Sequence, residues 1–272
     1  MKKRTSLKLL SSLTVALVMA TATPVMAETA EEKGFSIAAR SDRSDRGFGN
    51  SEVTSTMILR NSQGQESKRV MLQRTLEVPD ENLGDKSIII FESPADVDGT
   101  ALLSHAKILD PDNQWLYLPA LKRVKRISSK NKSGPFVGSE FAFEDFTAVE
   151  LNKYKYKYLR SETCPNEPSL TCDVIEQTPQ YEFSGYTKLI GWVDQKDYQG
   201  RQVDYYDRKG ELFKTLTSGK FKKYQGKYWR PHELKMVNHA TGKSTDFLFS
   251  DYKFDIGLDD NDFVKGILSR VR

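Results

Sequence analysis

The chain has 272 residues, of which 41 are Lys or Arg and 37 are Asp or Glu, and 38% are hydrophobic. Four of the basic residues and none of the acids lie in residues 1–27, so residues 28–272 carry equal numbers of the two charges. A chain without net positive charge lacks the long-range field that draws proteins to phosphates, which disfavours a nucleic-acid partner. The length suits one large β domain or two small ones.

Residues 1–27 have the features of a cleaved export signal. The chain starts with three basic residues after Met1, residues 9–20 are apolar, and Val25-Met26-Ala27 forms a small-x-small cleavage site. The apolar run is shorter than the ~20 residues that a transmembrane helix needs. We therefore predict a signal peptide over 1–27, a single exported domain over 28–272, and only peripheral contact with a membrane.

The first half of the exported chain predicts one helix and a series of hairpins. Apolar residues stand among charges over 28–46 until Gly47, which predicts an amphipathic helix. Residues 52–60 alternate apolar and polar side chains and the chain returns after Gly64, which predicts a long hairpin. Further strands are predicted at residues 66–78, 86–91, 107–118 (a hairpin turning at 110–113) and 122–128.

The second half contains the clearest strand pattern. Over residues 151–160, Tyr154, Tyr156 and Tyr158 fall on one face and lysines on the other, as in a half-buried antiparallel strand. Later strands are predicted at residues 172–176, 187–194, 202–207, 212–221, 228–238 and 243–254, and a C-terminal helix at 259–270. The strand spacing of ~8–14 residues, without a glycine-rich βα turn, predicts a mainly β fold with one largely antiparallel sheet and disfavours a nucleotide-binding fold.

Two cysteines, Cys164 and Cys172, bracket a proline-containing loop. In an oxidising compartment outside the cytoplasm, this spacing favours a disulfide that closes the loop. A free redox pair, or half of a metal site, is the alternative.

Residues 114–147 form the most aromatic stretch. A short apolar strand is followed by basic residues at Lys122, Arg123, Lys125 and Arg126. Four rings then fall within eleven residues, at Phe136, Phe141, Phe143 and Phe146. Each ring gains roughly 2–3 kcal/mol on burial, so these rings either close a core or line an apolar cavity that something else enters.

Four stretches of the chain closely resemble the periplasmic LolA-like outer membrane lipoprotein-sorting protein family. They are W-L-Y-L-P-A-L-K-R-V-K-R-I (115–127), F-V-G-S-E-F-A-F-E-D-F (136–146), and residues 91–103 and 200–207. The resemblance spans nearly all of residues 28–272. It implies that the sheet curves into an incomplete LolA/LolB-like β-barrel, covered by a few helices.

The resemblance also implies a function. It indicates a periplasmic carrier that binds the acyl chains of a lipoprotein or lipid and shuttles them towards the outer membrane. The implied partner is an inner-membrane transporter of the resistance-nodulation-division type. The chain is longer than the family's main lipoprotein carrier, so a lipid other than a lipoprotein is an open alternative as cargo.

These inferences select the residues that would contact cargo and partner. The glycine-flanked segment 136–146 is the best candidate for a lid, through Phe136, Phe141, Phe143 and Phe146. The candidates for the cavity wall are Leu116, Leu118, Trp192 and Trp229. The candidates for contact with a lipid headgroup or a membrane partner are Lys122, Arg123, Lys125 and Arg126, although a row of cations is also typical of a solvated strand face.

Catalysis has little support in the sequence. The three histidines, His105, His232 and His239, match no metal-binding spacing, and no G-x-S-x-G is present, so we predict no metal, no cofactor and no enzyme. A hydrolase could use Glu140, Glu144 and Asp145, but these acids more simply cap a helix or pair with the basic strand. The remaining alternative is a non-enzymatic adaptor or structural subunit of an envelope transport complex, with a filled core.

Overall fold

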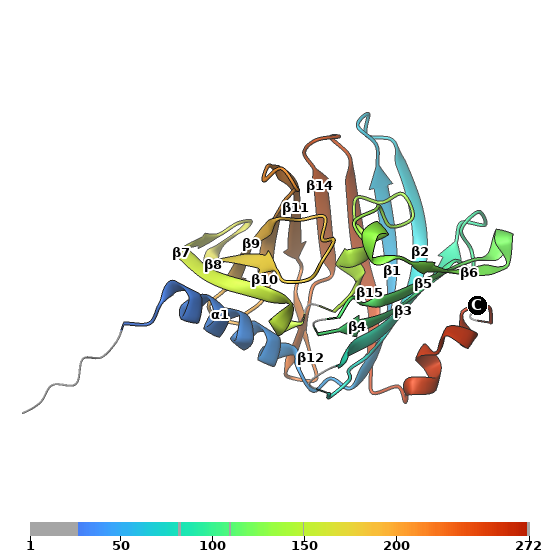
Figure 1. Cartoon of the computed structure of the whole chain (residues 1–272), viewed down its shortest axis with the longest axis horizontal. Helices are drawn as coiled ribbons and strands as arrows, with labels where there is room; N and C mark the ends of the chain where they lie inside the picture. Colours follow the sequence, from blue (N-terminus) through green and yellow to red (C-terminus); the bar gives the residue numbers. More distant parts are fainter. Residues whose placement is uncertain (1–26, 81–82, 109, 149, 271–272) are drawn as a thin grey trace, which may run out of the picture.

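The computed structural model describes residues 27–80, 83–108, 110–148 and 150–270, so the predicted signal peptide lies almost wholly outside the described residues. One helix, α1 (Ala30–Asp45), precedes a run of strands (Figure 1). These are β1 (Asn50–Arg60), β2 (Glu66–Leu76), β3 (Leu83–Ser93), β4 (Ala101–Lys107), β5 (Asn113–Leu118), β6 (Arg123–Ile127), β7 (Tyr154–Cys164), β8 (Glu167–Pro179), β9 (Lys188–Asp194), β10 (Gly200–Tyr206), β11 (Leu212–Gly219), β12 (Lys222–Tyr224), β13 (Tyr228–Arg230), β14 (Glu233–Asn238) and β15 (Ser244–Phe254).

Thirteen of these strands form one sheet in the order β6-β5-β4-β3-β2-β1-β15-β14-β11-β10-β9-β8-β7, while β12 and β13 pair separately. All neighbours in the sheet run antiparallel. In the described chain the edge strands β6 and β7 do not pair with each other, so the sheet remains open. The predicted fold class, a single open antiparallel sheet, is confirmed.

Alternation along the strands gives the sheet two buried faces. On β3, Ile89 and Phe91 join one hydrophobic cluster, whereas Ile88 and Ile90 join another. We call the first face the inner face, because the rings of the segment between β6 and β7 pack on it. The second, outer face is covered along β3, β4 and β5 by residues close to the C-terminus. Burial on both faces explains the nearly continuous apolar run in this strand.

Helix α1 covers the inner face at the β7 edge of the sheet. Thr29 and Glu32 form a capping box, which accounts for where the helix begins. Ile37 and Ala38 pack on Tyr156 and other residues of β7, β8 and β9. The predicted helix at 28–46 is confirmed.

The connection from β6 to β7 joins opposite edges of the open sheet. Residues 128–153 connect the two edges across the inner face, and the described ones, all but 149, form only short 3-10 turns, at Ser129–Asn131, Phe143–Phe146 and Leu151–Lys153. We call residues 128–153 the crossover. It occupies the space between the two halves of the curved sheet (Figure 1).

Two predicted elements at the end of the chain are wrong in detail. Residues 259–270 do not form a helix: they make 3-10 turns at Asp260–Phe263 and Lys265–Ile267, with Val264 extended between them. This break lets both Phe263 and Leu268 bury fully on the outer face. The predicted strand over 228–238 is interrupted before β14, where Pro231 has no N–H to donate to a neighbouring strand. No helix in the described ranges is long and apolar enough to cross a membrane.

The predicted disulfide is present. Cys164 and Cys172 are bonded and buried at the hairpin that joins β7 to β8, eight residues apart in sequence. Closing a loop of this size stabilises the fold by about 2–3 kcal/mol, mainly by restricting the unfolded chain. We expect Cys164→Ser together with Cys172→Ser to lower the free energy of unfolding by that amount in chemical denaturation. An unchanged denaturation midpoint for this double variant would contradict the expectation.

Candidate functional site

A cavity of about 1050 Å³ lies on the inner face beneath α1. Its walls come from the C-terminal half of α1, the starts of β1 and β3, the C-terminal end of β2, and inner residues of β7, β8, β9 and β10. Residues of β13, β15 and the end of the crossover close it. The apolar part of the lining includes Val53, Ile175, Leu189, Val203 and Phe249. Because the cavity spans both halves of the sheet, only the folded chain can form it.

Tyrosines give the apolar wall a polar component. Tyr156 donates a hydrogen bond to the Leu151 carbonyl (3.0 Å), and Tyr252 donates to that of Pro231 (3.1 Å). Tyr205 is only 7% exposed, yet its hydroxyl makes no hydrogen bond with any described residue. The cavity therefore offers both apolar surface and an unused hydrogen-bonding group.

Carboxylates gather in another part of the lining. Glu77 accepts hydrogen bonds from the backbone N–H groups of Gly47 (2.7 Å) and Gly49 (2.9 Å). Asp85 accepts one from the Val78 N–H (2.9 Å), and Glu150 accepts one from the Asp85 N–H (3.3 Å). Burial raises the pKa of Glu150, and it raises that of Asp85 to about 6, to which the nearby charge of Glu150 contributes.

The shifted pKa of Asp85 predicts a pH dependence of stability. A pKa above the ordinary carboxyl value means that the folded protein binds this proton more tightly than the unfolded chain does. The contribution of Asp85 to stability is thus greatest below the ordinary value and is lost as pH rises through about 6. We expect Asp85→Asn to remove a pH-dependent change of about 2 kcal/mol between pH 4 and 8. Urea denaturation across this range measures it, with the exposed Glu182→Gln as control; parallel curves for Asp85→Asn and the unmodified protein would contradict it.

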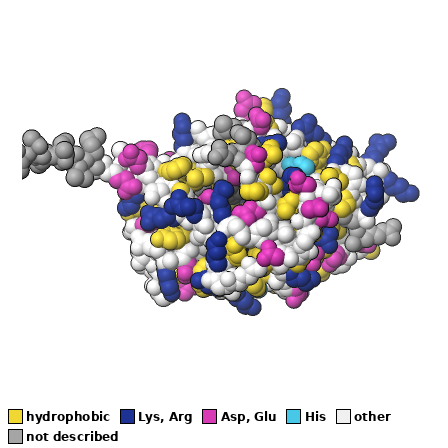
Figure 2. Space-filling model, turned by 90° about the horizontal axis from the view of Figure 1, so that it is seen from below, with side chains coloured by type: hydrophobic (Ala, Val, Ile, Leu, Met, Phe, Trp, Pro, Cys, Tyr) yellow, Lys and Arg dark blue, Asp and Glu magenta, His cyan; other side chains and the backbone are white. Residues whose placement is uncertain are grey.

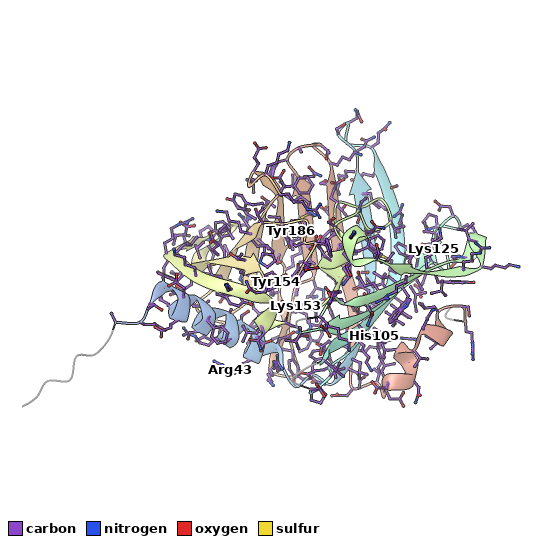
Figure 3. The ribbon with its side chains drawn as sticks, viewed as in Figure 1. Arg43, His105, Lys125, Lys153, Tyr154 and Tyr186 are labelled. Carbon is purple, nitrogen blue, oxygen red and sulfur yellow. A yellow bond between two sulfur atoms is a disulfide. The ribbon has the colours of Figure 1, made fainter. Side chains whose placement is uncertain are left out.

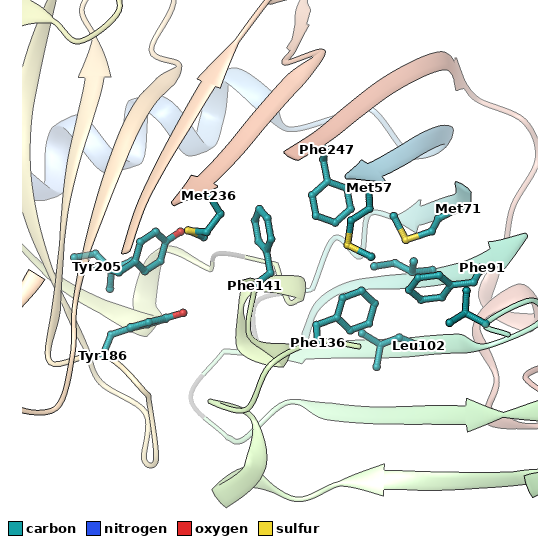
Figure 4. Close-up of a cluster of buried hydrophobic side chains, with 13 residues drawn as sticks. Met57, Met71, Phe91, Leu102, Phe136, Phe141, Tyr186, Tyr205, Met236 and Phe247 are labelled. Atoms are coloured by element: carbon teal, nitrogen blue, oxygen red, sulfur yellow. The ribbon is translucent and has the colours of Figure 1, made fainter. Parts of the chain in front are cut away.

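The four phenylalanines of the crossover lie on the inner face next to the cavity. Phe136 contacts Phe91, Phe143 and Phe146, with ring centroids 5.7, 5.7 and 4.3 Å away, and Phe141 packs edge-on against Phe247 at 4.9 Å. Figure 4 shows Phe136 and Phe141 projecting among side chains of β1, β2, β3 and β15. In this structure the rings fill one part of the inner face, and the 1050 Å³ cavity occupies another.

Buried polar contacts attach the crossover to the second half of the sheet. Glu144 accepts hydrogen bonds from Tyr181 (3.2 Å), Ser184 (3.0 Å) and the Gly185 N–H (2.8 Å), and burial together with the charge of Asp145 raises its pKa. Asp145 caps its own turn by accepting from the Ala142 N–H (2.7 Å). These acids therefore do not pair with the basic strand; the prediction that they cap a helical turn holds for Asp145.

Other contacts attach the crossover to the first half. The Lys132 and Lys153 ammonium groups both pair with Asp112, at 3.5 and 2.7 Å. The Gln114 side chain donates to the Phe143 carbonyl (2.7 Å), and Arg69 donates to that of Val137. In Figure 3, Lys153, Tyr154 and Tyr186 lie in the middle of the molecule, between the two halves of the sheet. The crossover is thus held from both sides.

A small pocket of about 70 Å³ lies between the crossover and the main cavity. It shares Ala148, Tyr154, Leu189 and Tyr205 with the lining of the larger cavity and also touches Glu144 and Asp145. These four shared side chains therefore form the boundary between the small pocket and the cavity.

The structure separates the residues that the sequence grouped as cavity wall. Trp229 lines the cavity, whereas Leu116 packs against the cluster around the crossover rings and Leu118 is half-buried. Trp192 borders the cavity through β9, but its indole packs with Cys164 and Cys172 and donates to Glu162 (2.6 Å). Most of the lining was missed; the inward tyrosines of β7 were the one sequence signal that pointed to it.

The basic strand β6 is solvent-exposed at an edge of the sheet. Lys122, Arg123, Lys125 and Arg126 are all exposed, and among the described residues none of them pairs with a carboxylate. Arg126 donates to Asn113 instead (2.7 Å). Figure 3 places Lys125 at the β6 side, away from Tyr154 and Tyr186.

The histidines have structural partners. His105 donates from Nε2 to the Phe263 carbonyl (2.7 Å), and His232 donates from Nδ1 to that of Phe249 (2.8 Å). His239 shares a hydrogen bond with Thr215 (2.9 Å). Within the described part of the chain, no group of three or more His, Cys, Asp or Glu side chains could hold a metal ion.

Comparisons with known proteins agree with this architecture. A structure described as an outer membrane lipoprotein-sorting protein domain from Vibrio parahaemolyticus is 50% identical, with a TM-score of 0.85 over 88% of this chain and 100% of that one. A DUF1329 family protein from Desulfovibrio piger is 26% identical (TM-score 0.82, 88% and 99% covered). A LolA superfamily protein from Nitrosomonas europaea, 23% identical with a TM-score of 0.67 (88% and 99% covered), shares the fold. A family model described as "Uncharacterized protein" matches residues 84–270. No curated protein matches the chain significantly.

Proposed function

Because the chain belongs to the LolA-like family of outer membrane lipoprotein-sorting proteins, we propose that it is a periplasmic carrier that holds acyl chains in the cavity beneath α1. In this function the protein shields the chains of a lipoprotein or another lipid on the way to the outer membrane. It performs no catalysis. Transfer of an unshielded chain through water is costly, because each exposed CH₂ forgoes ~0.8 kcal/mol.

The observation that carries the proposal is the cavity itself. Ligand pockets commonly measure ~300–1,000 Å³ and combine an apolar wall with a few polar groups. The cavity of about 1050 Å³ lies at the upper end of that range, with Leu189, Val203 and Phe249 in its wall. A space of this size beneath a single helix, with apolar side chains along part of its wall, suits a flexible chain.

The crossover would act as the lid. Its rings already lie on apolar side chains of the inner face, so lid and acyl chain would compete for similar surface and exchange at little net cost. In the loaded protein, Phe136, Phe141, Phe143 and Phe146 would contact the chain from one side, and Leu116, Leu118 and Trp229 from the other. The exposed cations Lys122, Arg123, Lys125 and Arg126 would meet the inner-membrane transporter, of the resistance-nodulation-division type, that loads the carrier.

Native mass spectrometry of the protein purified from its own periplasm, followed by organic extraction, tests the proposal. We expect a bound acylated species, and we expect Val203→Trp to reduce it at least several-fold by filling the cavity. Leu212→Trp, at an exposed position on β11, serves as the matched control and should leave binding unchanged. A bare protein that also fails to take up a fluorescent fatty-acyl probe would instead support an adaptor with a filled core.

A further inference from the structure

Acidic side chains outnumber basic ones in the lining of the cavity. The lining contains the carboxylates of Asp42, Asp45, Glu77, Asp80, Asp85 and Glu150, and only two cations, Arg46 and Arg230. Both cations are already engaged, since Arg46 pairs with Asp42 (2.7 Å) and Arg230 pairs with Asp45. No ion pair with a described residue reaches Glu77, Asp85 or Glu150.

The position of Glu150 is enforced by its surroundings. Gly84 lies against it so closely that a Cβ at this position would be 2.3 Å from Glu150 Oε1. Glu150 is only 8% exposed; one of its oxygens accepts the single bond from the Asp85 N–H, and the other has no partner among the described residues. The fold thus holds a nearly buried, incompletely satisfied carboxylate in the cavity wall.

Holding these carboxylates in the cavity wall costs free energy in the folded protein. Burial disfavours the ionised forms of Asp85 and Glu150 and raises the pKa of both carboxyl groups. The charge of Glu150 adds to the rise at Asp85, and the charge of Arg46 opposes the rise at both groups. On the face seen from below, by contrast, basic and acidic side chains are interspersed with hydrophobic ones (Figure 2).

We propose that the cavity selects amphiphiles whose headgroup carries a positive charge, a primary or quaternary ammonium group, over those with a phosphate or carboxylate headgroup. The apolar chain lies along Leu189 and Val203, and the ammonium group lies among Glu77, Asp85 and Glu150, where it supplies the missing counter-charge. An anionic headgroup meets like charges at short range in a partly desolvated site and is rejected. The inference rests on the proposed carrier function and names the class of cargo.

Three probes with the same C12 chain test this selectivity: dodecyltrimethylammonium, dodecyl phosphate and uncharged monolaurin, each below its micellar concentration. Binding is measured by displacement of a fluorescent fatty-acyl probe. We expect the ammonium probe to bind at least about tenfold more tightly than the phosphate probe. In the double variant Asp85→Asn/Glu150→Gln, we expect this ratio to approach one while monolaurin binds as before, which shows that the cavity is intact.

Glu167→Gln/Glu182→Gln is the matched control, because it makes the same carboxylate-to-amide changes at exposed positions and should keep the tenfold preference. If monolaurin binds but the phosphate probe equals or exceeds the ammonium probe, the selectivity is overturned and the carrier function stands. If the control variant loses the preference as fully as the cavity variant does, the preference comes from the overall charge of the protein and not from the carboxylates in the cavity, and the proposed site is overturned. If none of the three probes binds, both the carrier function and its selectivity are overturned.

Discussion

Replacing Lys214 with methionine is expected to lower the free energy of unfolding by about 3–5 kcal/mol. The Lys214 side chain is only 3% exposed, and its ammonium group donates to Tyr186 Oη (2.7 Å) and to the Glu140 carbonyl (3.0 Å), with Asp145 at 3.5 Å. Methionine has a similar length but leaves these three acceptors in a site that water does not reach. A buried charge that loses its partner costs far more than the pair itself contributes.

Chemical denaturation measures this loss, and Lys220→Met supplies the control. Lys220 also pairs with a carboxylate, Glu233 at 3.0 Å, but its side chain is 69% exposed, so its replacement should change stability by less than about 1 kcal/mol. Adding Asp145→Asn to Lys214→Met should recover part of the loss, because it removes the stranded charge. Equal effects of the two lysine substitutions would show that the contacts of Lys214 with the crossover contribute little.

The second large effect is expected at Gly34, where α1 approaches β7 most closely. A Cβ on Gly34 would lie 2.7 Å from the carbonyl carbon of Lys157 and from the backbone nitrogen of Tyr158, neither of which can rotate away. We therefore expect Gly34→Leu to displace α1 and to lower the free energy of unfolding by about 3 kcal/mol, as Ile37 loses its burial. Leucine forms helices better than glycine, so a loss of intrinsic helix propensity would not explain the result.

Hydrogen exchange resolves this effect within the molecule. In Gly34→Leu, the amides of α1 should exchange much faster, while those of β3 and β4 should stay protected, because α1 packs at the opposite end of the sheet. The matched control is Gly219→Leu, at a glycine of β11 with no atom within 4 Å of an added Cβ. Unchanged protection of α1 in Gly34→Leu would mean that the helix can rest elsewhere on the inner face.

The sequence predicted the elements whose signals are local. The period-2 tyrosines at 154, 156 and 158 marked β7, and the charge pattern and terminal glycine marked α1. The cysteine spacing marked the disulfide. Each of these depends on residues that are neighbours along the chain, so no knowledge of the fold was required.

Features set by contacts between distant residues were harder to predict. The helix predicted at 259–270 is replaced by two separate turns, which bury both Phe263 and Leu268 on the outer face over β3 and β4. Alternation in β9 shows that Trp192 and Ile190 lie on the same face of the strand, but it does not indicate which face of the sheet borders the cavity. The cavity lining comes from α1, nine strands and the crossover, and no single stretch of sequence contains its pattern.

The pairing of β1 with β15 has a consequence for how the chain assembles. The first strand of the sheet lies beside the last, with Ser51 opposite Phe254, so the contact closes a loop of almost the whole chain. Contacts of such long range form late and slowly. During folding, the half-sheet from β1 to β6 can form first, but its β1 edge has unpaired backbone groups until residues 244–254 arrive. An exposed strand edge can pair with other chains, so the interval before the last strand docks is when the folding protein is most prone to aggregate.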